Sequence, residues 1–272
     1  MSGMSAIMNV MQEAARKASR GLQRDFGEIE TMQVSRKGPA DFVAHAARKT
    51  KQTIHEQLTQ ARPGYGFLME EQGAIVGTDK SHRFIIDPIN GKTNFLHGIP
   101  HFGISIALER EIDGNPRELV AGLVYNPLTD DMWFAEKGRG AFINDGTRGG
   151  GDRRLKPTQR ELFSDCHFAT GIPSVGQKGH TKFLKEIHQV MGTSAGVRSM
   201  GAPGLDLAWT AAGRYDGFWQ RGLRRWDMAA GIIIAQEATL AVESLTPGVV
   251  MDTGDIIVTT HELLPTLKER VA

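Results

Sequence analysis

The chain has 272 residues, a formal net charge of +1 at pH 7, 40% hydrophobic residues and 23% charged residues. These values are typical of a globular protein with one large domain or two small halves, and they exclude a disordered, fibrous or coiled-coil chain. The near balance of charge gives no electrostatic basis for direct binding of nucleic acid or of an anionic membrane surface. Cys166 is the single cysteine, so an internal disulfide and a cysteine-based zinc site are excluded, and we expect it to be a small buried side chain.

The first half of the chain predicts two helices followed by strands. Apolar residues recur at helical spacing in the two helical segments, and the second of these ends at Pro63 and Gly64. Short apolar or alternating runs follow, which is typical of strands, and two of them flank the turn at residues 126–130 as a hairpin. The expected helices cover residues 4–20 and 43–60, and the expected strands cover residues 84–86, 104–109, 119–125 and 132–136.

The segment at residues 146–157 is glycine-rich and basic. It is favoured as an exposed linker, with a phosphate-binding loop as the alternative. We therefore divide the chain into an N-terminal αβ half, 1–145, and a C-terminal αβ half, 146–272, which together form one catalytic unit.

The second half again mixes helices and strands. The expected helices cover residues 180–191, 205–213, 227–237 and 261–271, and the expected strands cover residues 215–219 and 256–258. Helices and strands that alternate along the whole chain predict a layered α/β fold. No apolar run is long enough to cross a membrane and the first residues lack a signal-peptide pattern, so we expect a cytoplasmic protein that does not enter a membrane.

The most informative stretch runs from Phe84 to Phe95, where a buried strand leads into Asp87, a proline and a glycine turn. Such a turn presents side chains and backbone carbonyls to a cleft. Glu70 and Glu71 lie upstream, and Asp227 opens an apolar helix far downstream. Taken singly, Asp227 also fits a helix cap, and the two glutamates also fit a solvated turn.

Together these motifs resemble the inositol monophosphatase family. The strand–turn stretch, the Glu70-Glu71 turn and Trp226-Asp227-Met228-Ala229-Ala230-Gly231 occur in the family's order, and the similarity extends over nearly the whole chain. The resemblance implies an αβαβα sandwich, a homodimer, and hydrolysis of a small phosphorylated substrate with Mg²⁺. It names Glu70, Asp87 and Lys92 as the catalytic positions.

The resemblance also implies how the site binds its ligands. Carboxylate and carbonyl oxygens are the donors that Mg²⁺ prefers, and the backbone of Gly91 and Lys92 would receive the phosphate. The implied metal ligands are Glu70, Asp87, the Ile89 carbonyl, Asn90 and Asp227. The implied substrate-binding residues are Asn90, Gly91, Lys92, Thr93, Gln220 and Asp227.

The chain departs from the family pattern at the site itself. Asn90 replaces an aspartate, Lys92 a threonine, Ala47 an aspartate of the second helix, and Gln220 an acid that contacts substrate hydroxyls. The first change removes one negative charge and the second adds one positive charge, a net shift of +2 that equals the charge of one Mg²⁺, so we expect fewer ions than the family usually binds. Lys92 either occupies a metal position and pairs with Asp87 or Asp227, or points to solvent while Asn90 still supplies an oxygen ligand.

Two further features near these motifs have competing interpretations. Gly91-Lys92-Thr93 is not a P-loop, because Ile86 stands where that motif needs its first glycine. Three arginines, Arg221, Arg224 and Arg225, precede Asp227, and they either attract a phosphorylated substrate or form a solvated face.

The leading functional hypothesis is a Mg²⁺-dependent phosphomonoesterase that acts on inositol monophosphate or a related polyol or sugar phosphate. The alternative is a catalytically impaired relative that binds a phosphorylated ligand or regulates a partner, such as a component of the transcription machinery.

Overall fold

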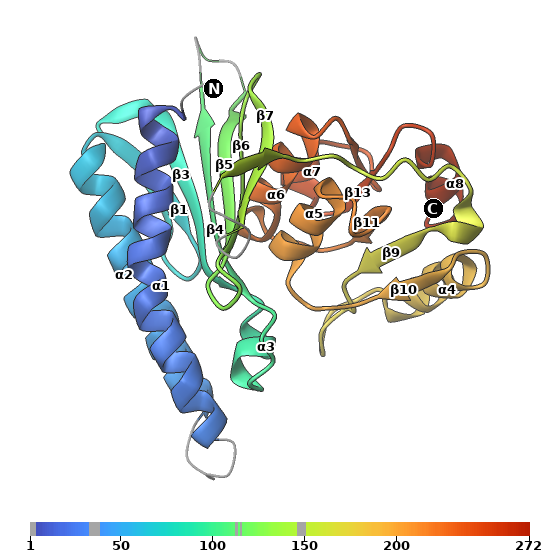
Figure 1. Ribbon diagram of the computed structural model, residues 1–272, viewed down its shortest axis with the longest axis horizontal. Coiled ribbons are helices and arrows are strands. Elements are labelled where there is room, and N and C mark those ends of the chain that lie inside the picture. The colour runs from blue at the N-terminus through green and yellow to red at the C-terminus, as the bar shows by residue number, and fades with distance from the viewer. Residues whose placement is uncertain (1–3, 33–38, 112–113, 115, 146–150) are drawn as a thin grey trace.

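The fold is a five-layer αβαβα sandwich, as the sequence predicts (Figure 1). The computed structural model describes residues 4–32, 39–111, 114, 116–145 and 151–272. An N-terminal helix pair covers one face of a large sheet, two further helices lie between this sheet and a smaller one, and the helices His180–Met191 and Leu264–Arg270 cover the outer face of the small sheet. Within the described residues, no helix is both long and apolar enough to cross a membrane.

The outer layer is formed by α1 (Ala6–Met32) and α2 (Pro39–Ala61), which pack against each other and against the large sheet. Their apolar residues recur every three or four positions and are buried, as Met8, Met11 and Leu22 in α1 illustrate. Both helices are longer than predicted, and α1 continues beyond residue 20 through Leu22, Phe26 and Ile29, which are buried at helical spacing. Ala47 is buried in this packing, so α2 brings no carboxylate to the sheet at that position.

The large sheet has eight strands in the order β2-β1-β3-β4-β5-β6-β7-β8. The predicted hairpin around residues 126–130 is present as β5 and β6. The strands are β1 (Tyr65–Met69), β2 (Gly73–Ile75), β3 (Asp79–Asn90), β4 (Gly103–Arg110), β5 (Glu118–Asn126), β6 (Asp131–Glu136), β7 (Gly140–Asp145) and β8 (Asp152–Arg154), and the short helix α3 (Lys92–Leu96) follows β3.

The central helices are α5 (Pro203–Ala211) and α6 (Arg225–Glu237), which contact strands of both sheets. They approach each other closely at Gly231, where an added Cβ would lie 2.5 Å from the Cβ of Leu207. Nearly every residue of α6 beyond its first turn is buried, which accounts for its continuously apolar sequence.

The small sheet has five strands in the order β10-β9-β11-β13-β12. The predicted helix at His180–Met191 has those limits in the structure, whereas the closing helix begins at Leu264 rather than His261. The elements are β9 (His167–Thr170), β10 (Gly196–Arg198), β11 (Gly217–Gln220), β12 (Ala241–Ser244) and β13 (Ile256–Thr259), with the helices η1 (Phe163–Asp165), α4 (His180–Met191), α7 (Val250–Thr253) and α8 (Leu264–Arg270).

The predicted division of the chain at residue 145 stays a prediction. The start of the expected linker, residues 146–150, lies outside the described residues. Beyond it, β8 pairs with β7 and so continues the large sheet.

Candidate active site

The site begins where β3 ends, at Asp87 and Asn90. The pairing of β3 with β4 shifts register between these two residues, so the strand breaks locally and the side chains leave the regular alternation. The buried Asp87 carboxylate accepts hydrogen bonds from the Ile89 backbone N–H at 3.1 Å and from the Asn90 Nδ2 at 2.9 Å. The Asn90 Oδ1 in turn accepts from the Gly204 N–H at 2.7 Å, so Asn90 ties Asp87 to the first turn of α5.

The turn after β3 depends on Gly91. Its φ is +97°, a conformation that glycine adopts without strain, and an added Cβ would lie 3.0 Å from the His101 carbonyl oxygen. The Asn94 Nδ2 donates to the backbone oxygens of His101 at 2.7 Å and Met200 at 2.6 Å, which holds the turn and α3 in place. Thr93 is exposed on α3.

Lys92 and Glu70 form an ion pair across the site. The Lys92 Nζ lies 2.6 Å from the Glu70 Oε2 and 4.0 Å from the Glu71 Oε1. A second lysine, Lys51 of α2, lies 3.5 Å from Glu71 and donates to the Glu70 backbone oxygen at 3.2 Å. The sequence predicted that Lys92 either pairs with Asp87 or Asp227 or points to solvent. Neither interpretation matches, because the Lys92 ammonium pairs instead with Glu70 and lies close to Glu71.

Asp227 completes the group from the start of α6. Its Oδ2 accepts the Arg224 backbone N–H at 2.7 Å from the third position of the helix, so Asp227 supports the helix start through a capping box, while Arg224 rather than Asp227 is the N-cap residue. Burial raises the pKa of Asp227 to about 6, and the negative charge of Glu70 adds to that rise. Burial likewise raises the pKa of Asp87, to about 8, and the negative charge of Asp227 is the second largest cause of that rise. Because the charges of Asp227 and Glu70 both raise the pKa of Asp87, the three carboxyl groups lie close together.

These residues fit one divalent cation better than several. In the described part of the chain, no group of three or more Asp, Glu, His or Cys side chains could by itself hold a metal ion, so any bound cation would also need oxygen ligands from substrate or water. Glu70 is neutralised by Lys92, which leaves Asp87 and Asp227 as carboxylates without an ammonium partner. Mg²⁺ is commonly held by one or two carboxylates together with substrate phosphate and water, so this donor set fits that ion.

Gln220 lies at the end of β11, beside a cavity of about 500 Å³ that Arg224 also lines. The amide packs directly against Gly171, where an added Cβ would lie 2.1 Å from the Gln220 Cδ. The sequence analysis missed Gly171, Lys51 and Gly204. Gly171 follows the strand β9 and lies two residues before Pro173, whereas Lys51 and Gly204 have no distinguishing local signal.

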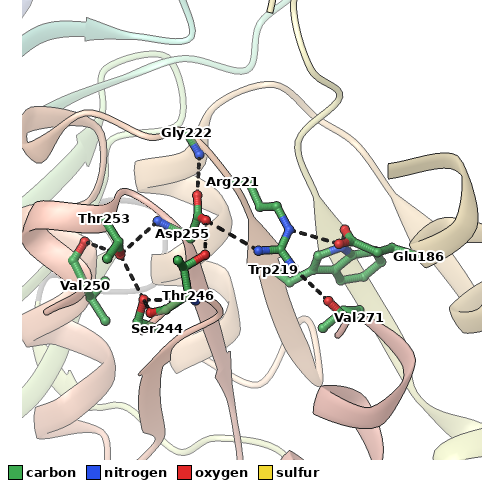
Figure 2. Close-up of polar contacts among 10 residues, drawn as sticks. All are labelled: Glu186, Trp219, Arg221, Gly222, Ser244, Thr246, Val250, Thr253, Asp255 and Val271. Carbon is green, nitrogen blue, oxygen red and sulfur yellow. Dashed lines mark hydrogen bonds and ion pairs between the residues drawn. The ribbon is translucent and has the colours of Figure 1, made fainter. Parts of the chain in front are cut away.

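The three arginines before Asp227 have different environments. Arg221 lies between Glu186 and Asp255 and also donates to the Val271 carbonyl, and Figure 2 shows this network. Arg225 pairs with Asp252. Arg224 is exposed and its guanidinium has no ion-pair partner within the described residues, so of the three it is the one available to a ligand.

A sequence model of the inositol monophosphatase family matches residues 4–272. The chain belongs to this family. An inositol-1-monophosphatase of Caulobacter vibrioides is 49% identical over 263 residues, which is 96% of this chain and 99% of that protein. The crystal structure of the extragenic suppressor protein suhB from Bartonella henselae has a TM-score of 0.86 and 46% identity, with 98% of each chain covered.

Another member of the inositol monophosphatase family bears a different kind of name. The Nus factor SuhB of Pseudomonas aeruginosa is 35% identical over 247 residues, which is 89% of this chain and 87% of that protein. Family membership thus places the chain among phosphatases by sequence and fold, and the chain is also similar to a protein named Nus factor SuhB.

Proposed function

We propose that this protein is a Mg²⁺-dependent phosphomonoesterase that hydrolyses inositol monophosphate or a related small polyol or sugar phosphate. The observation that carries the proposal is the convergence of Asp87 and Asp227 beside the Gly91–Lys92 turn. Two carboxylates without an ammonium partner provide the negative charge that a divalent cation needs, and the adjacent turn offers backbone N–H groups to a phosphate.

Each residue of the candidate active site has a distinct part in this proposal. Asp87, Asp227 and the Ile89 carbonyl would hold the metal, and Asn90 would keep Asp87 oriented through its hydrogen bond. Glu70 would orient the attacking water, with its own carboxylate held by Lys92. Gly91 and Lys92 would position the phosphate through their backbone. Bound Mg²⁺ supplies charge stabilisation of the phosphoryl oxygens and activation of water.

The direct test is phosphate release from inositol 1-phosphate across a Mg²⁺ titration. We expect Mg²⁺-dependent turnover that Asp87→Asn abolishes, because the substitution removes a carboxylate from the buried centre. Asp41→Asn, an exposed aspartate in the first turn of α2, is the matched control and should keep full activity. Absence of turnover at any Mg²⁺ concentration would reject the proposal.

A second function is favoured by two specific contacts. The Asn90 amide donates to Asp87, and the Lys92 ammonium pairs with Glu70, so two acidic positions are satisfied without any metal. Together with the similarity to a protein named Nus factor SuhB, this supports a catalytically impaired regulatory protein with a transcription-machinery partner. Under this second function, the wild type would not release phosphate, and the double variant Asn90→Asp, Lys92→Thr would gain phosphatase activity. Binding of the partner would change neither with Mg²⁺ nor with Asp87→Asn.

A further inference from the structure

A cavity of about 500 Å³ that is partly open to solvent lies beside Gln220. It lies between the segment that follows β9, the end of β11 and the start of α6. It opens next to the candidate active site, because Arg224 both lines the cavity and donates its backbone N–H to Asp227. Small-ligand sites have volumes of roughly 300–1,000 Å³, so a substrate bound at Asp227 has room to extend into it.

The carboxylates that line this cavity are already engaged. The Glu186 carboxylate accepts from the Arg221 Nε at 2.9 Å and from the Trp219 Nε1 at 3.3 Å. Asp255 accepts from Arg221 at 3.4 Å and from the Gly222 N–H at 3.0 Å, as Figure 2 shows. Since Asp252 pairs with an arginine outside the cavity, none of the three lining acids is left for a ligand cation.

The polar groups left without a partner are mainly donors. In the described part of the chain, Lys178 and Arg224 line the cavity and have no ion-pair partner, and the Gln220 amide forms no hydrogen bond with the protein. The Thr170 hydroxyl also lines the cavity, is fully buried and has no hydrogen-bond partner. A guanidinium and an ammonium with nearby amide and hydroxyl groups are the partners that an anion rich in acceptor oxygens requires.

The close contact between Gly171 and Gln220 fixes where the amide lies. Because a Cβ at residue 171 would overlap the amide, only glycine leaves this space to Gln220. The amide is neutral, so it offers hydrogen bonds without repelling an anion, whereas a carboxylate at the same place would oppose one. The Gly171–Gln220 contact therefore favours binding of an anion, as do Lys178 and Arg224, which have no ion-pair partner among the described residues.

We propose that this cavity binds a second phosphate of the substrate, so that the enzyme prefers small polyols carrying two phosphates over the corresponding monophosphates. The inference rests on the proposed function for the phosphate at Asp87 and Asp227. The cavity would recognise the second phosphate and so distinguish a bisphosphate from a monophosphate. Arg224 and Lys178 would be the residues that decide this preference.

The test compares inositol 1,4-bisphosphate with inositol 1-phosphate on the full chain. Dissociation constants are measured by calorimetry in EDTA, and phosphate release is measured with Mg²⁺. We expect the bisphosphate to bind roughly three- to tenfold more tightly, the range for charge-assisted contacts that stay partly exposed to water. Arg224→Gln, Lys178→Gln and the nearly isosteric Gln220→Glu should each reduce that ratio.

Matched controls remove the same charges elsewhere. Lys182→Gln lies on the exposed face of α4 and Arg20→Gln on the exposed face of α1, and both should leave the ratio unchanged. A wild-type ratio near one, or a ratio that Arg224→Gln and Lys178→Gln leave intact, overturns the inference. If the protein hydrolyses inositol 1-phosphate but binds the bisphosphate no more tightly, the proposed function holds and the second phosphate site is rejected. If it binds the bisphosphate more tightly but hydrolyses neither compound, the second phosphate site holds and the proposed function is rejected.

Discussion

Replacing Lys92 by methionine removes a positive charge from the candidate metal site while keeping most of the side-chain volume. In the structure, the Lys92 ammonium lies 2.6 Å from the Glu70 carboxylate, and the two side chains are 31% and 29% exposed. The substitution therefore frees a carboxylate next to Asp87 and Asp227. We expect Lys92→Met to bind divalent cations more tightly than the wild type.

The size of the gain follows from the repulsion between an ammonium and a doubly charged ion. At a separation of roughly 6 Å this repulsion is about 1.4 kcal/mol in a water-like dielectric and about 5 kcal/mol at an effective dielectric constant of about 20. Because the ion pair is partly exposed, the lower value is the better guide, and it corresponds to about tenfold tighter binding. Loss of the ion pair itself should cost the metal-free protein about 0.2–1 kcal/mol of unfolding free energy.

Free Mn²⁺ measured by electron paramagnetic resonance gives the dissociation constant without relying on turnover. Lys49→Met, an exposed lysine of the same helix that carries Lys51, is the matched control and should bind Mn²⁺ as the wild type does. Equal Mn²⁺ affinity for Lys92→Met and the wild type would refute the reasoning, because it would mean that the ammonium does not compete with the cation.

Three further outcomes test other parts of the structure. Asn90→Asp places a second carboxylate about where an amide now donates to Asp87, so without metal the unfolding free energy should fall by about 1–3 kcal/mol. In thermal melts, Mn²⁺ should restore part of the lost stability. A melting temperature of the variant that does not depend on Mn²⁺ would contradict this prediction. Gly231→Ala forces a methyl group into the contact between α5 and α6 and should destabilise by about 1–3 kcal/mol, whereas Gly27→Ala, in open space on α1, should stabilise by up to about 1 kcal/mol. Burial raises the pKa of the Cys166 thiol to about 11, so alkylation at pH 8 should proceed only as the protein unfolds, and rapid labelling of the native protein would show that the thiol is accessible.

The layered fold was predictable because its signals are local. The periodicity of α1 and the turn between β5 and β6 lie within short windows of sequence, and both were confirmed. The edge strands β8 and β10 were not predicted, since each has three residues and β8 is fully exposed. Such strands are specified by pairing with a distant neighbour rather than by their own composition.

The membership of the site stays a prediction, and its contacts could not be predicted from the sequence. Motifs on three separate segments brought Glu70, Asp87 and Asp227 into one hypothesis, and the structure places them around a common space. The partner of Lys92 was not predictable, because the chain position of a long flexible side chain does not determine which of several nearby carboxylates it meets. The Gly171–Gln220 contact depends on the pairing of β9 with β11, which the sequence alone does not reveal.

The lysines and acids of the site together suggest how many ions it accommodates. Glu70, Glu71, Asp87 and Asp227 contribute four negative charges when ionised, and Lys51 and Lys92 contribute two positive charges through contacts with the two glutamates. The residual charge of two equals that of one divalent cation, and a second cation would leave the site with excess positive charge in a partly buried setting. In the metal-free site Asp87 and Asp227 have no ammonium partner among the described residues, and burial raises the pKa of both carboxyl groups. A single ion shared with substrate phosphate is therefore the occupancy that this arrangement of charges favours, and Lys92→Met, which raises the residual negative charge to three, should bind that ion more tightly.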